Sequence, residues 1–189
     1  MIQVRIHGRG GQGVVTAAEL LALAAFNDGY FAQAFPAFGV ERSGAPIQSF
    51  VRINKQAIIT REQVQAPDIL IVQDASLLNE KEVLFGIKKN TQLIINSPLE
   101  SKEISKLLKN KIKSANIYST PATDIALHWL GKNIVNTVIL GAFIRRNKII
   151  KLETLLKAVS QKFADKGEAL IKKNKSAITA AYNYVHKEK

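Results

Sequence analysis

Apolar and polar residues alternate in some stretches of this chain and recur every three or four residues in others. Residues 2–7 (IQVRIH) and 47–53 (IQSFVRI) alternate, which is typical of strands with one buried face. Residues 68–74 (DILIVQD) and 92–96 (QLIIN) contain short continuous apolar runs, which are typical of strands at the centre of a parallel sheet. These four segments predict the core of a β-sheet.

Shorter apolar segments predict the remaining strands. Residues 30–35 (YFAQAF) and 116–120 (NIYST) have the length and composition of short strands. Residues 57–60 (AIIT) follow the alternating segment 47–53 closely, so we expect the two to pair as a small antiparallel β-ribbon.

Helical periodicity separates the expected strands and dominates the second half of the chain. An apolar helix is expected at 14–26, another helix at 76–85, and a lysine-rich helix after Pro98. Apolar residues three or four apart predict four further helices, at 121–130, 133–146, 152–163 and 166–187.

The order of these elements defines the expected fold class. Strands that alternate with helices predict an α/β fold with a Rossmann-like, mostly parallel sheet and crossover helices. The chain lacks a linker rich in Gly, Ser or Pro, so we expect a single domain (1–189). In it, residues 1–120 form the sheet and residues 121–189 a helical extension packed on the same domain.

Cysteine is absent from the 189 residues, and the three histidines, His7, His128 and His186, lie far apart in sequence. This composition excludes disulfides, thiol nucleophiles and iron–sulfur ligation by cysteines of this chain, and it offers no histidine pair with metal-ligand spacing. The chain starts directly with a strand, and its apolar runs are too short to cross a bilayer. We therefore expect a cytoplasmic protein without membrane association.

The net charge of +12 comes entirely from the second part of the chain. Residues 1–75 carry six basic and six acidic residues, whereas residues 76–189 carry 21 basic and nine acidic residues. Nucleic-acid-binding proteins usually cluster arginines among aromatic residues, and the basic helices here are rich in lysine without evident aromatic partners. We interpret them as solvated faces and expect no nucleic-acid partner, although an acidic protein or an anionic cofactor fits this charge.

The segment 8–13 (GRGGQG), here called the glycine turn, joins the first strand to the first helix with the spacing G-x-G-x-x-G. Such a turn leaves backbone N–H groups free at the positive end of a helix, which suits a phosphate or another anion. A tight turn explains its first and last glycines. It does not explain the middle residues GGQ, which weaken a helix start, so we interpret the turn as a ligand or partner contact to which Arg9 adds a cation.

A dinucleotide site would need a further acidic residue at the end of the second strand, about 20 residues past the glycines, to bind the ribose hydroxyls. The strand at 30–35 ends instead in Phe35 and Pro36, while Asp28 precedes it and Glu41 comes too late. The glycine spacing alone is therefore weak support for NAD(P). A free-standing Rossmann-like nucleotide-binding protein stays the alternative hypothesis.

A second charged loop occupies residues 39–48 (GVERSGAPIQ), in which Arg42 is a fork-shaped donor suited to a carboxylate or a phosphate. In an open α/β sheet, ligands collect outside the carboxyl ends of the strands. The glycine turn, this loop, Asp74, Asn96 and Ser97 are all expected at that edge. Convergence of several segments predicts a binding site there.

The segments RIHGRGGQGVVTAAELLALAAF, AQAFPAFGVERSGAP, FVRI, REQVQAPDILIVQD, LIINSP and GKNIVNTVILGAF occur in this order, the last with Asn136 and Gly141. Together they resemble the gamma subunit of the 2-oxoacid:ferredoxin oxidoreductases, and most of all the pyruvate enzymes (pyruvate synthase). At position 43 the chain carries Ser43 where many relatives have a second arginine. The arginine role is therefore assigned to Arg42.

The resemblance implies an activity that belongs to a complex. Such enzymes cleave a 2-oxoacid with thiamine diphosphate, pass electrons through iron–sulfur clusters to ferredoxin, and release acyl-CoA. It implies that thiamine diphosphate, Mg and the clusters lie on alpha, beta and delta (ferredoxin-like) sister subunits, and that this chain alone binds no cofactor. The isolated chain is expected to be inactive, and whether it forms a homodimer on its own is left open.

The resemblance also implies that the chain supplies subunit contacts and part of the coenzyme A side of the site. No catalytic or metal-binding residue is assigned to it. The residues expected to bind are those of the two loops and of one strand end: Gly8, Arg9, Gly10, Gly11, Gln12, Gly13, Glu41, Arg42, Ser43, Gly44 and Asn96.

Overall fold

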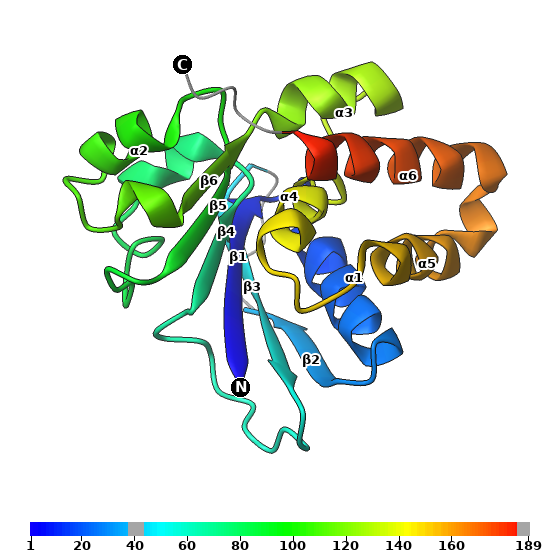
Figure 1. Cartoon of the computed structure of the whole chain (residues 1–189), viewed down its shortest axis with the longest axis horizontal. Helices are drawn as coiled ribbons and strands as arrows, with labels where there is room; N and C mark the ends of the chain where they lie inside the picture. Colours follow the sequence, from blue (N-terminus) through cyan, green and yellow to red (C-terminus); the bar gives the residue numbers. More distant parts are fainter. Residues whose placement is uncertain (38–43, 185–189) are drawn as a thin grey trace.

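A six-stranded sheet forms the centre of the molecule in the computed structural model, which describes residues 1–37 and 44–184. Helices lie on both faces of this sheet (Figure 1). The strand order is β2-β3-β1-β4-β5-β6. The strands are β1 (Ile2–Arg9), β2 (Phe31–Pro36), β3 (Pro46–Asn54), β4 (Ile69–Val72), β5 (Gln92–Asn96) and β6 (Ile117–Thr120).

The predicted α/β fold is confirmed, and the sheet is mixed. The β1/β4, β4/β5 and β5/β6 pairs are parallel, while β3 runs antiparallel to both of its neighbours, β1 and β2. The predicted ribbon between 47–53 and 57–60 is therefore wrong. Both faces of β3 are buried, with Val51 and Ile53 on one side and Phe50 on the other, so this strand lies inside the sheet.

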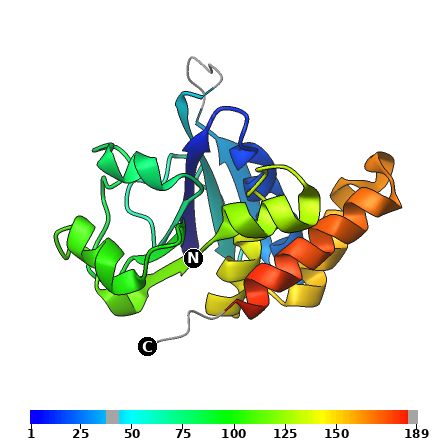
Figure 2. The same ribbon diagram turned by 90° about the horizontal axis from the view of Figure 1, so that it is seen from above.

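Two helices pack directly on one face of the sheet, three more pack on these from outside, and the other face carries one short helix (Figure 2). The helices are α1 (Val14–Asn27), α2 (Ser101–Leu107), α3 (Ala122–Leu130), α4 (Val138–Arg146), α5 (Leu152–Lys162) and α6 (Glu168–Asn183). Three short 3-10 helices add to these: η1 (Ala75–Asn79), η2 (Ser114–Asn116) and η3 (Ala164–Lys166).

The main core lies between the sheet and the helices α1 and α4, and it extends to α5 and α6, which pack on these two helices. It packs Val4 and Ile6 of β1 against Leu21 of α1, Phe143 of α4 and Leu155 of α5, all of them fully buried. A second core on the opposite face joins residues of β4 and β5 to η1 and α2. The C-terminal helices therefore complete the core of the sheet, as the sequence predicts.

Two predicted helices differ from the observed elements. The helix expected at 76–85 is reduced to η1, and the carbonyl oxygens of Val83 and Phe85 that follow it accept hydrogen bonds from the buried side chain of Arg5. The helix expected from residue 133 begins only at Val138, and just before it the side chain of Asn136 accepts a hydrogen bond from the backbone N–H of Thr137.

The helices α4 and α6 approach each other closely at Gly141. A Cβ atom at this position would lie 2.2 Å from the carbonyl oxygen of Ile178 and 3.0 Å from the Cβ of Ala181. Backbone atoms of a helix cannot move aside as a flexible side chain can. The glycine therefore sets the distance between the two helices.

We predict that Gly141→Ala lowers the free energy of unfolding by about 1–3 kcal/mol, because the clash outweighs the better helix propensity of alanine. Urea unfolding followed by circular dichroism measures this change. Lys173→Ala, at an exposed position of α6, is the control and should leave the stability within about 0.5 kcal/mol. A Gly141→Ala protein as stable as the wild type would contradict the close packing.

Candidate functional site

The carboxyl ends of β1, β4, β5 and β6 meet at one edge of the sheet, here called the carboxyl edge. The glycine turn follows β1, Asp74 and Ser76 follow β4, and Asn96 ends β5. Hydrogen bonds join the turn to Gly44 and to Asp74. The predicted convergence of these segments is therefore found among the described residues.

Close packing explains the first and the last glycine of the turn. A Cβ at Gly8 would lie 2.6 Å from Cγ2 of Val14, and one at Gly13 would lie 2.2 Å from Nδ2 of Asn136. Gly13 also has a φ of +71°, which disfavours other residues. At Gly11 φ is +93° and the space is open, so only the backbone conformation requires glycine there.

Gln12 holds the turn together from within. Its side-chain oxygen accepts the N–H of Arg9 at 2.7 Å, and its amide nitrogen lies 3.4 Å from Oδ2 of Asp74. Gly10 donates its N–H to Ala45 at 2.8 Å. The predicted binding role of Gln12 stays untested, and these contacts give the side chain a structural role that the sequence did not reveal.

Arg9 connects three segments at the carboxyl edge. Its Nε donates to Oδ2 of Asp74 at 3.1 Å, one terminal nitrogen to the carbonyl of Gly44 at 3.1 Å, and the other to Oγ of Ser76 at 2.8 Å. A guanidinium has five N–H donors, so two remain for a ligand. The side chain is 34% exposed, which leaves it accessible.

Asp74 is the acceptor on which this network converges. Besides Arg9 and Gln12, it accepts the backbone N–H of Ser76 at 3.0 Å and the hydroxyl of Ser76 at 2.6 Å. Burial alone raises the pKa of Asp74, but the hydrogen bonds from Ser76 and the charge of Arg9 outweigh it and hold the pKa below its ordinary value. The carboxylate is therefore ionised at neutral pH.

The first turn of α1 points its backbone N–H groups toward the same edge. Within the described residues, no side chain caps this helix, whose N-cap is Gly13. Uncapped N–H groups at a helix N-terminus favour an anion. Together with Arg9, they give the glycine turn a positive character.

The predicted site residues of the second loop are placed only in part. Glu41, Arg42 and Ser43 lie outside the described residues. Gly44 donates its N–H to the carbonyl of Gly10 at 3.1 Å and accepts Arg9 through its own carbonyl. The described end of this loop is thus joined directly to the glycine turn.

Asn96 fastens β5 to its neighbours. Its amide nitrogen donates to the carbonyl of Gln73 at 3.0 Å and to Oγ1 of Thr123 at 2.9 Å, and its oxygen accepts the N–H of Thr123 at 3.1 Å. These bonds use the polar atoms of the side chain. Its role as a ligand stays a prediction, whereas its role in the fold is direct.

Two buried basic residues of β1 lie on the same face as Arg9. Arg5 donates to the carbonyls of Val64, Gln65, Val83 and Phe85, and burial lowers its pKa. Burial, and secondarily the charge of Arg5, lowers the pKa of His7 to about 3. The alternation of side chains along β1 places Arg5, His7 and Arg9 on one face of the strand. That this face is buried as well as the other depends on packing with the rest of the fold.

The strand order removes the geometry of a dinucleotide site. In that fold the strand after the glycine helix pairs in parallel with the first strand. Here β3 lies between β1 and β2 and runs antiparallel to both. The described residues at the end of β2 also include no acid. Both the parallel second strand and the acidic residue that a dinucleotide site needs are therefore missing from the described residues.

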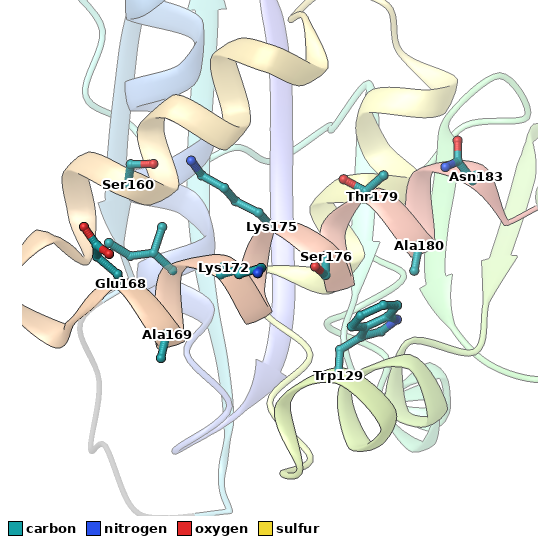
Figure 3. A pocket seen from close by; sticks show the side chains of 11 residues that line it. Trp129, Ser160, Glu168, Ala169, Lys172, Lys175, Ser176, Thr179, Ala180 and Asn183 are labelled. Carbon is teal, nitrogen blue, oxygen red and sulfur yellow. The ribbon is translucent and has the colours of Figure 1, made fainter.

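A wide groove of about 1010 Å³ lies away from the glycine turn, where α5 and α6 meet the end of α3 (Figure 3). Trp129 of α3 faces α6, which contributes Lys172 and Lys175.

In residues 1–37 and 44–184, His, Asp and Glu side chains form no cluster that could hold a metal ion. No helix in these ranges is both long and apolar enough to span a bilayer.

Residues 3–184 match the protein family described as pyruvate ferredoxin/flavodoxin oxidoreductase. The chain belongs to this family. It is 45% identical over 188 residues to the pyruvate synthase subunit PorC of Methanocaldococcus jannaschii, covering 100% of this chain and 99% of that one. It is 45% identical over 182 residues to the pyruvate/ketoisovalerate oxidoreductases common subunit gamma of Pyrococcus furiosus, covering 96% of both chains.

A solved structure has the same fold. The pyruvate oxidoreductase subunit PORC of Thermotoga maritima superimposes with a TM-score of 0.81 at 34% identity, covering 96% of this chain and 94% of that chain. The prediction of a gamma-type subunit of a 2-oxoacid oxidoreductase is confirmed, and family members of this kind are parts of multi-subunit enzymes.

We predict that Asp74→Asn lowers the free energy of unfolding at pH 7 by about 1–3 kcal/mol, because Arg9 and Ser76 lose a charged acceptor. The pKa of Asp74 is lowered by folding, so its contribution is present above about pH 3.9 and is lost as the pH falls through the folded pKa. Urea unfolding at pH 7 and pH 3 should show the difference shrinking in acid. The exposed Glu80→Gln is the control, and equal midpoints at pH 7 would contradict the network.

We predict that His7 makes stability fall as the pH drops. Its folded pKa of about 3 lies below the unfolded value of about 6.5, so protons bind the unfolded chain first, and stability is lost from pH 6.5 downward. His7→Gln should flatten the plot of urea midpoint against pH between 4.5 and 6.5. His128→Gln, exposed on α3, should keep the wild-type slope. An unchanged slope in His7→Gln would show that another group is responsible.

Proposed function

We propose that this chain is the gamma subunit of a pyruvate synthase-type 2-oxoacid:ferredoxin oxidoreductase and that its carboxyl edge forms part of the coenzyme A side of the site. The observation that carries the proposal is the meeting of three features at one edge. Arg9 keeps two N–H donors available, the N-terminus of α1 is uncapped, and the end of the Arg42 loop is bonded to the turn.

The chemistry of coenzyme A fits such an edge. Its diphosphate and 3′-phosphate groups are anions that bind well to guanidinium forks and to backbone N–H groups at a helix N-terminus. In this proposal Arg9 and Arg42 hold a phosphate group, and the glycine turn lets the ligand approach the backbone. Holding the phosphates orients the thiol arm toward the acyl group formed on a sister subunit.

The proposed division of labour leaves bond breaking to other chains. Thiamine diphosphate, Mg and the iron–sulfur clusters lie on alpha, beta and delta sister subunits, with ferredoxin as the electron acceptor of the complex. The gamma chain acts as one domain in the cytoplasm. It binds and orients coenzyme A and contacts its partner subunits. We assign pyruvate as the substrate because the relatives' names contain it. The name of the Pyrococcus relative adds ketoisovalerate, a branched-chain 2-oxoacid, as a second candidate substrate.

We predict that Arg42→Ala weakens coenzyme A binding by the assembled complex about tenfold, which corresponds to one lost charge-assisted contact. The measurement is the dissociation constant of coenzyme A, with the KM for the oxoacid followed in parallel. Arg61→Ala removes an exposed arginine elsewhere and is the matched control. Unchanged coenzyme A affinity in Arg42→Ala would exclude the proposed role of this residue.

A further inference from the structure

A second cavity of about 330 Å³, here called the arginine cavity, lies beside the edge strand β6. It is lined by the C-terminal ends of α4 and α6, by β6 and by the segments that contain Ser101 and Ser114. Its volume is at the lower end of the range for small-molecule sites. None of the residues of the expected binding loops lines it.

Two consecutive arginines at the end of α4, both exposed, line this cavity, and each rests on a tyrosine ring. The Cζ atom of Arg146 lies 4.1 Å from the ring centroid of Tyr118, and that of Arg145 lies 5.4 Å from the centroid of Tyr182. The hydroxyl of Tyr118 donates to the carbonyl of Ala115 at 2.6 Å, which fixes this ring. Stacking holds a guanidinium in place without using its N–H donors, and Arg146 also hydrogen-bonds to the hydroxyl of Tyr118, which leaves its other N–H groups for a ligand.

The charge of these arginines is not neutralised within the described part of the chain. Neither Arg145 nor Arg146 has an ion pair with an Asp or Glu of residues 1–37 or 44–184, and no acidic residue lines the cavity. Hydroxyl groups of Ser101, Ser114 and Thr120 line it instead. The cavity therefore gathers hydrogen-bond donors and positive charge.

From this arrangement we infer that the arginine cavity binds the phosphate group of a small organic molecule. Two guanidinium forks and three hydroxyls offer more donors than the lone pairs of one carboxylate can accept, whereas a phosphate monoester presents three strong acceptor oxygens and nearly two charges. The size of the cavity leaves room for a small organic portion besides the phosphate.

This site is separate from the carboxyl edge. The first residues of α4 follow Asn136, which contacts Gly13 of the glycine turn, while Arg145 and Arg146 lie at the opposite end of this nine-residue helix. An α-helix rises about 1.5 Å per residue, so roughly 12 Å of helix separate the two places. The test of the proposed coenzyme A role and the test of this second site can therefore have different outcomes.

The experiment uses the full-length chain and a titration with glycerol phosphate, monitored by calorimetry at constant ionic strength. Acetate and inorganic phosphate are the comparison ligands. We expect saturable binding of glycerol phosphate, tighter than that of either comparison ligand. The double variant Arg145→Gln/Arg146→Gln should bind it at least tenfold more weakly, and Arg145→Lys/Arg146→Lys, which keeps the charge but loses the forks, should lie in between.

The matched control is Lys148→Gln, which removes an exposed positive charge two residues beyond Arg146 and outside the cavity. It should bind like the wild type. The proposal is overturned if the wild type shows no saturable binding, if both arginine double variants bind as tightly as the wild type, or if Lys148→Gln loses the same affinity. Circular dichroism of each variant verifies that it is folded.

Discussion

The carboxylate of Asp74 is the acceptor on which the architecture of the candidate site depends. It takes Arg9 and Gln12 from the glycine turn and Ser76 from the segment after β4, so a single side chain ties the ends of two parallel strands together. Arg9 extends the network to Gly44. The conformation of the turn, the direction of Arg9 and the described end of the second loop therefore depend on a charged group that itself contacts no ligand in the proposal.

The local spacing of apolar residues was sufficient to predict individual strands and helices, because each of these depends on its own segment. The alternation of β1 and β3, the apolar runs of β4 and β5 and the stripe of α5 were recognised from spacing. The place of β3 in the sheet was not, because pairing depends on which buried faces meet. Nor can local periodicity reveal that Arg5 donates hydrogen bonds to the carbonyls of Val83 and Phe85, about 80 positions away in sequence.

The same distinction applies to the site. Gly13 was predicted from its place before a helix, and the structure adds the contact with Asn136 that makes it necessary. Gln12 was assigned to a ligand because a tight turn does not require a polar residue at a helix start, and Asn96 because it ends a strand. Both side chains form internal hydrogen bonds. The stacking of Arg145 and Arg146 on tyrosines contributed by α6 and β6 was not predicted, because it joins segments far apart in the sequence.

The buried pair on β1 gives the molecule a fixed electrostatic background. Arg5 keeps its charge because backbone carbonyl dipoles surround it, and His7 stays uncharged because burial and that same charge oppose its protonation. The charge states of these two residues are therefore constant across the physiological pH range. An anion that approaches this edge meets the same buried background charge at every pH in that range, whatever the ionisation of the anion itself.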